Sequence, residues 1–203
     1  MPEGLLIVIE GIDGTGKSTQ AARLGEWFTA QGREVVLSYE PTAGPWGKKI
    51  RETGATGRLS PEDELQYFLN DRQQHVSELI TPALAAGKVV ILDRYYFSTM
   101  AYQGLRGFDP QEIRRKNEAF APIPDLVLVM DLDVDTALRR IGARGESANA
   151  FEQRDNLARC REIFLSLKDE PFVRVIDASG TLDEITRRVV EVAAELKAAT
   201  LPH

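Results

Sequence analysis

The sequence has few of the features that mark secreted or membrane proteins. It contains one cysteine, Cys160, in 203 residues, which excludes an internal disulfide and fits a reducing compartment. Met1–Glu10 lacks the basic and apolar segments of a signal peptide, and no apolar run approaches the roughly 20 residues that span a bilayer. We therefore expect a cytoplasmic protein without a membrane partner.

Positive charge is also scarce. The chain has 25 Lys and Arg against 31 Asp and Glu, for a net charge of −6 and a pI near 5.1. A nucleic-acid surface is usually basic, so we expect no nucleic-acid partner, although clustered arginines can still bind a phosphate. Repeats, linkers and low-complexity segments are missing, and 43% of the residues are apolar. Residues 1–203 are therefore predicted to form a single domain.

The most informative stretch of the chain is residues 5–19. Its apolar start, Leu5–Ile9, is typical of a buried parallel strand. Gly11–Ser18 then matches the phosphate-loop pattern G-x-x-x-x-G-K-[ST], and a helical pattern follows. The alternative is a glycine-rich turn that binds nothing; the strand, the second glycine and the Lys-Ser pair favour phosphate binding.

The residue types in this loop suit a nucleotide phosphate. Backbone N–H groups of residues 14–19 can converge on the anion at the positive end of the helix. Lys17 supplies a catalytic positive charge, and the Ser18 hydroxyl suits Mg²⁺. The donor-site residues expected here are Gly11, Asp13, Gly14, Thr15, Gly16, Lys17, Ser18 and Thr19.

Strand patterns alternate with helical patterns along the rest of the chain. We expect strands at 34–38, 88–92, 126–131 and 173–176, a short helix at 47–52, and a loop at 53–59. One long helix should run from Ser60 towards Ala86 with a bend at Pro82. This order predicts an α/β fold, with a doubly wound five-stranded parallel sheet covered by helices on both faces. Ligands in such folds lie at the carboxyl ends of the strands.

Two further groups of residues suggest chemistry. Asp93 and Arg94 directly follow a strand, where the carboxylate can order magnesium and the guanidinium can neutralise a migrating phosphoryl group. The alternative is an ion pair that only stabilises the turn. Phe68 and Arg72 share a helix face, as a residue pair that stacks on a base and binds its edge would. Core packing for Phe68 and a surface salt bridge for Arg72 are the equally simple alternative.

Taken together, these motifs resemble the thymidylate kinases, in the nucleoside monophosphate kinase group of P-loop kinases, over nearly the whole chain. The motifs that carry the resemblance, in order, are Gly11–Ser18, Glu40-Pro41, Phe68 with Arg72, Asp93-Arg94-Tyr95, Ser98-Thr99, Ala101-Tyr102-Gln103, Pro124-Asp125-Leu126, Arg144-Gly145-Glu146 and Asp177-Ala178-Ser179. Their combination is specific, whereas no single motif after the phosphate loop would be.

The resemblance implies ATP-dependent phosphorylation of dTMP to dTDP with Mg²⁺, in a homodimer. By resemblance, Asp13 would contact the sugar 3′-hydroxyl, Phe68 would stack on thymine, and Arg72 would bind the base edge. The other implied substrate contacts are Glu40, Pro41, Arg51, Arg94, Thr99, Tyr102 and Gln103, with Tyr102 crowding the place of a 2′-hydroxyl. Ala178 and Ser179 would flank adenine, and Ser18 and Asp93 would hold the metal.

Two positions depart from the family pattern. Tyr39 stands where many relatives carry an arginine for the acceptor phosphate, so Arg51 or Arg94 would take over that contact. Relatives with a glycine at the position of Gly14 take their catalytic positive charge from a lid arginine. The lid is expected at about residues 142–152, which makes Arg144 the first candidate, with Arg140 and Arg154 after it. The alternative for Arg144 is a solvated charge at a helix end.

Two rival functions use the same loop. A GTP-driven switch should contain Asn-Lys-x-Asp, which is missing from this sequence. A deoxynucleoside kinase needs a carboxylate to deprotonate a sugar hydroxyl, and Glu40 could serve as that base.

Overall fold

The computed structural model describes residues 3–56, 59–142 and 150–200. Its elements alternate as the sequence pattern predicts, and their bounds follow in chain order. They are β1 (Leu5–Glu10), α1 (Lys17–Ala30), β2 (Val35–Tyr39), α2 (Pro45–Thr56), α3 (Pro61–His75), the π-helical turn η1 (Val76–Ile80), α4 (Thr81–Ala85), β3 (Val89–Asp93), α5 (Tyr96–Gly104), α6 (Pro110–Glu118), β4 (Leu126–Asp131), α7 (Val134–Gly142), α8 (Ala150–Leu165), β5 (Val173–Asp177) and α9 (Leu182–Thr200).

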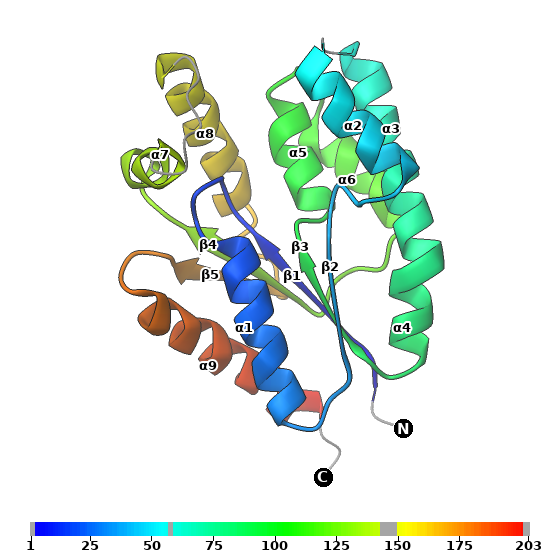
Figure 1. Cartoon of the computed structure of the whole chain (residues 1–203), viewed down its shortest axis with the longest axis vertical. Helices are drawn as coiled ribbons and strands as arrows, with labels where there is room; N and C mark the ends of the chain where they lie inside the picture. The colour runs from blue at the N-terminus through cyan, green and yellow to red at the C-terminus, as the bar shows by residue number, and fades with distance from the viewer. Residues whose placement is uncertain (1–2, 57–58, 143–149, 201–203) are drawn as a thin grey trace.

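The five strands form one parallel sheet in the order β2-β3-β1-β4-β5. Helices α1 and α9 lie side by side on one face, while α4 packs on β3 and α8 on β4 from the other (Figure 1). The predicted α/β fold class is thus confirmed. Every residue of β1 is buried, which explains its continuous apolar sequence.

The sheet register brings the polar strand ends together. Ile9 and Tyr39 both pair with Asp93, so β1, β2 and β3 end at the same level. Strand β1 leads into a helix on one face of the sheet, whereas its neighbours β3 and β4 lead into helices on the other. Such a change of direction opens a crevice at the carboxyl edge, and the segments after β1, β2 and β3 line it.

The structure corrects two boundaries that the sequence predicts. Helix α2 extends from Pro45 to Thr56, beyond both ends of the expected 47–52 helix and into the expected 53–59 loop. Pro45 is compatible with the helix because the first turn has no use for its missing N–H.

The expected long helix is divided into α3, the π-helical turn η1 and α4. Ser60 caps α3 as predicted, since its side chain accepts a hydrogen bond from the Asp63 amide. The change of helix type begins at Val76, earlier in the chain than Pro82, where the missing proline N–H predicts a bend.

Candidate active site

The phosphate loop joins β1 to α1 in a conformation that requires glycine. Gly11 and Gly14 have φ angles of 135° and 85°, and an added Cβ would lie 2.5 Å from the carbonyl oxygen of Met130 or 2.6 Å from that of Ala137. Gly16 precedes α1 and supplies no side-chain cap, so the first N–H groups of the helix point into the loop without a side-chain acceptor. This arrangement suits an anion.

A cavity of about 360 Å³ lies over this loop. Its lining includes Asp13, Gly14, Gly16, Lys17, Ser18, Thr19, Asp93, Arg94 and Ile141. Lys17 is buried, and its Nζ atom donates to the carbonyl oxygen of Ile12 at 2.9 Å. Burial lowers the pKa of Lys17 to about 8, and the positive charge of Arg94 acts in the same direction.

Ser18 and Asp93 form an oxygen-rich pair at the edge of that cavity. The Ser18 hydroxyl donates to Oδ2 of Asp93, while Oδ1 of Asp93 is buried without a hydrogen-bond partner. The described residues contain no cluster of three or more His, Cys, Asp or Glu side chains that could hold a metal alone. One carboxylate, one hydroxyl and the substrate phosphates are a typical ligand set for Mg²⁺, so the residues present fit that ion.

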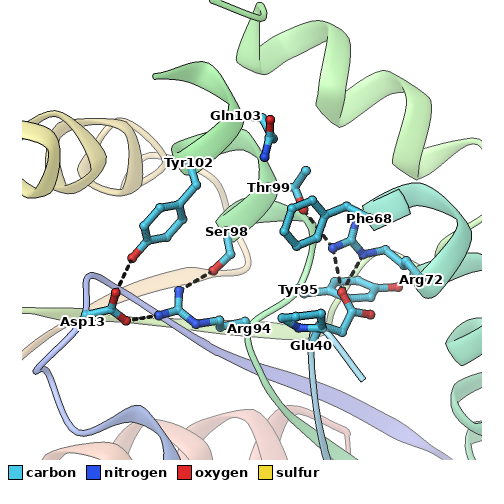
Figure 2. Close-up of a pocket in the computed structure, with 11 residues that line it drawn as sticks. Asp13, Glu40, Phe68, Arg72, Arg94, Tyr95, Ser98, Thr99, Tyr102 and Gln103 are labelled. Atoms are coloured by element: carbon cyan, nitrogen blue, oxygen red, sulfur yellow. Dashed lines mark hydrogen bonds and ion pairs between the residues drawn. The ribbon is translucent and has the colours of Figure 1, made fainter. Parts of the chain in front are cut away.

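A second cavity, of about 230 Å³, opens beside the first (Figure 2). Its lining residues are Asp13, Glu40, Pro41, Phe68, Arg72, Arg94, Tyr95, Ser98, Thr99, Tyr102 and Gln103. Nine of the ten predicted substrate-site residues are among them, with Arg51 the exception. Sequence reasoning assigned no role in this site to Tyr95 or Ser98.

Arg94 and Asp13 line both cavities and bind each other. The Arg94 guanidinium also donates to Ser98 Oγ at 3.0 Å. The backbone φ angle of Arg94 is 71°, the only positive value among the described non-glycine residues. The Tyr102 hydroxyl donates to the other Asp13 oxygen at 3.3 Å (Figure 2). Burial raises the pKa of Tyr102, so this hydroxyl remains a donor.

Glu10 accepts hydrogen bonds from the segment that follows Arg94, and the sequence alone assigns it no role. Its carboxylate accepts hydrogen bonds from the Tyr95 amide at 2.7 Å and the Ser98 amide at 3.1 Å, and from the Ser98 hydroxyl at 2.6 Å. Burial raises the pKa of Glu10 to about 7. A single carboxylate ending a fully buried apolar strand was the sequence signal for this residue.

Arg72 is held in a buried polar network. Its Nε and Nη2 atoms lie 2.8 and 2.6 Å from Glu40 Oε2, and its other partners are Asn117 Oδ1 at 2.6 Å and Thr99 Oγ1 at 3.0 Å. The guanidinium is 1% exposed, so the surface-salt-bridge alternative is wrong. Phe68 is half-buried and faces the same cavity (Figure 2).

Comparison with known proteins gives the same assignment over most of the chain. The family model described as thymidylate kinase matches residues 9–189. The chain belongs to the thymidylate kinase family. The thymidylate kinase of Xanthomonas euvesicatoria pv. vesicatoria is 54% identical over 92% of this chain and 82% of its own. The thymidylate kinase of Akkermansia muciniphila is 52% identical over 92% of this chain and 90% of its own. The thymidylate kinase of Xanthomonas campestris pv. campestris strain B100 is 52% identical over 95% of this chain and 85% of its own.

Membership of the thymidylate kinase family disfavours the deoxynucleoside kinase alternative, and the geometry of Glu40 gives a physical reason. Both Glu40 oxygens are engaged, Oε2 by Arg72 and Oε1 by Nδ1 of His75 at 3.0 Å. A carboxylate bound between two donors is poorly suited to accept a proton from a sugar hydroxyl. The described residues include no helix that could cross a membrane.

Neither Arg51 nor Tyr39 lines the second cavity. The Arg51 guanidinium donates to the carbonyl oxygens of Pro41 at 3.0 Å and Thr42 at 2.7 Å, which fixes the loop after β2. Tyr39 is 51% exposed and lines a neighbouring cavity together with Ser18 and Arg94. Of the two arginines predicted to replace the missing one, Arg94 is the one that lines the second cavity.

Of the expected adenine and lid residues, Arg140 contacts the phosphate loop, whereas Ser179 and Arg154 have partners elsewhere. Ala178 is buried, and the Arg140 guanidinium lies 3.3 Å from its carbonyl oxygen and 3.5 Å from that of Gly14. The Ser179 amide donates to Asp177 Oδ1 at 2.8 Å. Arg154 pairs with Asp135 on α7 at 2.9 and 3.3 Å. Arg144, with most of the expected lid, lies outside the described residues.

Proposed function

We propose that the chain transfers the γ-phosphoryl group of ATP to dTMP, forming dTDP, with Mg²⁺ bound at Ser18 and Asp93. The supporting observation is that two cavities meet at Arg94 and Asp13, one over a phosphate loop and one lined by Phe68 and Arg72. A donor in the first and an acceptor in the second would place their phosphates on either side of the Arg94 guanidinium. Phosphoryl transfer depends mainly on such positioning and charge neutralisation.

The polar groups of the acceptor cavity fit a thymine edge. Arg72 donates one hydrogen bond to a protein acceptor from each of Nε, Nη1 and Nη2, and Nη2 is also ion-paired with Glu40. The second N–H of Nη1 is therefore available to a ligand. Gln103 donates through Nε2 to Glu64 at 3.0 Å, and its Oε1 is buried without a partner. One donor and one acceptor complement the O4 and N3–H of thymine, whereas cytosine offers the reverse pattern.

Residues of both cavities would then bind and align the two phosphates. Lys17 and the loop amides would bind the donor phosphates, and Arg94 would neutralise the acceptor phosphate and hold it in line. Bound Mg²⁺ contributes charge neutralisation on the donor phosphates. An acceptor phosphate is already anionic, so the transfer needs no general base, and no covalent enzyme intermediate is involved.

The test is ADP release with MgATP across a panel of acceptors that includes dTMP, dUMP, dCMP, dGMP and thymidine. The proposal predicts that dTMP has the highest kcat/KM and that dCMP is used poorly because of its reversed base edge. A preference for dCMP or for a purine nucleotide would refute it.

Assembly and location are proposed on the family resemblance. We infer a cytoplasmic homodimer, which light scattering after size exclusion would detect as a particle of twice the 22.6-kDa chain mass. A particle of the single-chain mass at working concentration would contradict the dimer.

A further inference from the structure

A buried histidine lies next to the acceptor site, one helical turn from Arg72. His75 ends α3, and its side chain is 4% exposed. Its Nδ1 atom lies 3.0 Å from Glu40 Oε1, and its Nε2 atom lies 2.8 Å from the Ser38 hydroxyl on β2. Both ring nitrogens are therefore used, and the imidazole connects the sheet edge to the carboxylate that holds Arg72.

The carboxylate of Glu40 is shared between two residues one helical turn apart. Arg72 binds Oε2, and His75 binds Oε1. Glu40 is 5% exposed, so removal of the imidazole would leave Oε1 buried without a donor. A buried acceptor without a partner is costly, and rotation of the carboxylate towards another donor would displace the Arg72 guanidinium with it.

The hydrogen-bond chemistry sets a direction for this chain of contacts. A carboxylate oxygen only accepts, so Nδ1 of His75 carries the proton that it donates to Glu40, and Nε2 is the nitrogen that contacts the Ser38 hydroxyl. The contacts run from Ser38 through His75, Glu40 and Arg72 to Thr99, at the wall of the acceptor cavity.

The local backbone also changes at this residue. The π-helical turn η1 begins directly after His75, with the Thr81 amide bonded to the Val76 carbonyl. Single π turns insert one residue into a helix and occur frequently at functional sites. Arg72 and His75, on the regular turn before it, keep the spacing that places both on Glu40.

We propose that His75 is a positioning residue for the acceptor nucleotide. By donating to Glu40 Oε1, it orients the carboxylate that fixes the Arg72 guanidinium, and so directs the remaining Arg72 N–H into the cavity. This inference rests on the proposed function, because it takes dTMP as the occupant of that cavity.

A matched pair of substitutions separates the two ring nitrogens. The amide of Asn can occupy the place of Nδ1 and still donate to Glu40, whereas the amide of Gln reaches the place of Nε2 and contacts only Ser38. His75→Gln should raise KM for dTMP about tenfold, the equilibrium scale of one lost bond to a charged group, and leave kcat and KM for ATP within about twofold. His75→Asn and Ser38→Ala should keep KM for dTMP within about twofold of the unchanged protein.

Gln73→Ala, at an exposed position of the same helix, serves as the control. Equal effects of His75→Asn and His75→Gln, or parallel increases in KM for dTMP and KM for ATP, would mean that His75 is only a packing residue. Unchanged kinetics in His75→Gln would also overturn the proposal. A failure of the unchanged protein to use dTMP would instead refute the proposed function, so the two outcomes are distinguishable.

A second measurement covers the case in which His75→Gln does not fold. His75 lines a separate cavity of about 270 Å³ together with the exposed Tyr39, so imidazole from solution can reach the space left by His75→Ala. Added imidazole should lower KM for dTMP in His75→Ala without changing KM for ATP. No response to imidazole in a folded His75→Ala protein with raised KM would contradict the positioning role.

Discussion

The Nζ atom of Lys17 lies 2.9 Å from the carbonyl oxygen of Ile12, inside the phosphate loop itself. Its carboxylate neighbour Asp13 is more distant, at 3.9 Å. A backbone oxygen of the loop is thus a closer partner of the ammonium than the Asp13 carboxylate is. Because burial lowers the pKa of Lys17 to about 8, its charge depends on pH in a range that binding experiments can reach.

ATP affinity should therefore fall as the pH rises above about 8. Bound phosphates favour the charged ammonium and raise the pKa of Lys17, so the complex holds a proton that the free protein has begun to lose. Binding near pH 8 should take up a fraction of a proton, and affinity should then drop towards about tenfold per pH unit. Calorimetry in buffers of different ionisation enthalpy measures this proton uptake directly.

Lys17→Met is the control for that prediction. It should fold, since the side chain remains a buried aliphatic chain, but turnover should fall by about two to three orders of magnitude because a fixed charge at the phosphoryl group is lost. The pH dependence of ATP binding near pH 8 should disappear in the variant. Its persistence would assign the titration to another group.

Phe68→Ala should weaken dTMP binding by about 1–3 kcal/mol, the range for loss of one base–aromatic contact. Phe68 lines the acceptor cavity and not the phosphate-loop cavity, so ATP affinity should be unchanged. Calorimetry with each nucleotide separately measures both. Equal weakening of both nucleotides would show that Phe68 supports the fold and not the base site.

Tyr102 offers a test of sugar selection. Tyr102→Ala should raise kcat/KM for the ribose counterpart of dTMP relative to kcat/KM for dTMP itself, because the ring that would crowd a 2′-hydroxyl is removed. Tyr102→Phe loses only the hydroxyl that donates to Asp13 at 3.3 Å, so it should keep the sugar preference. The ratio of kcat/KM values for the two nucleotides is the readout, and an unchanged ratio in Tyr102→Ala would place sugar selection elsewhere.

Among the arginines near the expected lid, Arg144→Ala should reduce kcat most. It should leave the melting temperature and dTMP affinity nearly unchanged, because an interaction made only in the transition state contributes to neither. Arg144→Lys should recover part of the rate, because it keeps the charge but loses the planar donor pair.

The other two arginines are matched comparisons. Arg154 pairs with Asp135, and Arg140 lies at the carbonyl oxygens of Gly14 and Ala178, so Arg154→Ala should stay active and Arg140→Ala should mainly raise KM for ATP. Single-turnover rates of the three variants decide between them. A large kcat loss confined to Arg140→Ala or Arg154→Ala would move the catalytic role to that residue.

The sequence was a good guide wherever a local pattern carried the structure. The phosphate loop needs glycines at fixed positions between a strand and a helix. The five strands were predictable because each is a short apolar run of the length that is typical of a strand. The capping of α3 by Ser60 was predictable for the same reason. These features depend on near neighbours in the chain.

The partners of buried polar groups were not predictable in this way. Glu10 and Ser98 are 88 residues apart, and Glu40 and His75 are 35 apart, so their contacts exist only once the sheet order and helix positions are set. Arg72 illustrates the same limit, because spacing alone could not separate a surface ion pair from a guanidinium that is 1% exposed.

The most direct test of the central claim is a competition between dTMP and thymidine for MgATP, with products followed by ³¹P NMR. If the enzyme phosphorylates dTMP, dTDP and ADP accumulate together while thymidine is left unchanged. Conversion of thymidine to dTMP, without formation of dTDP, would contradict that claim.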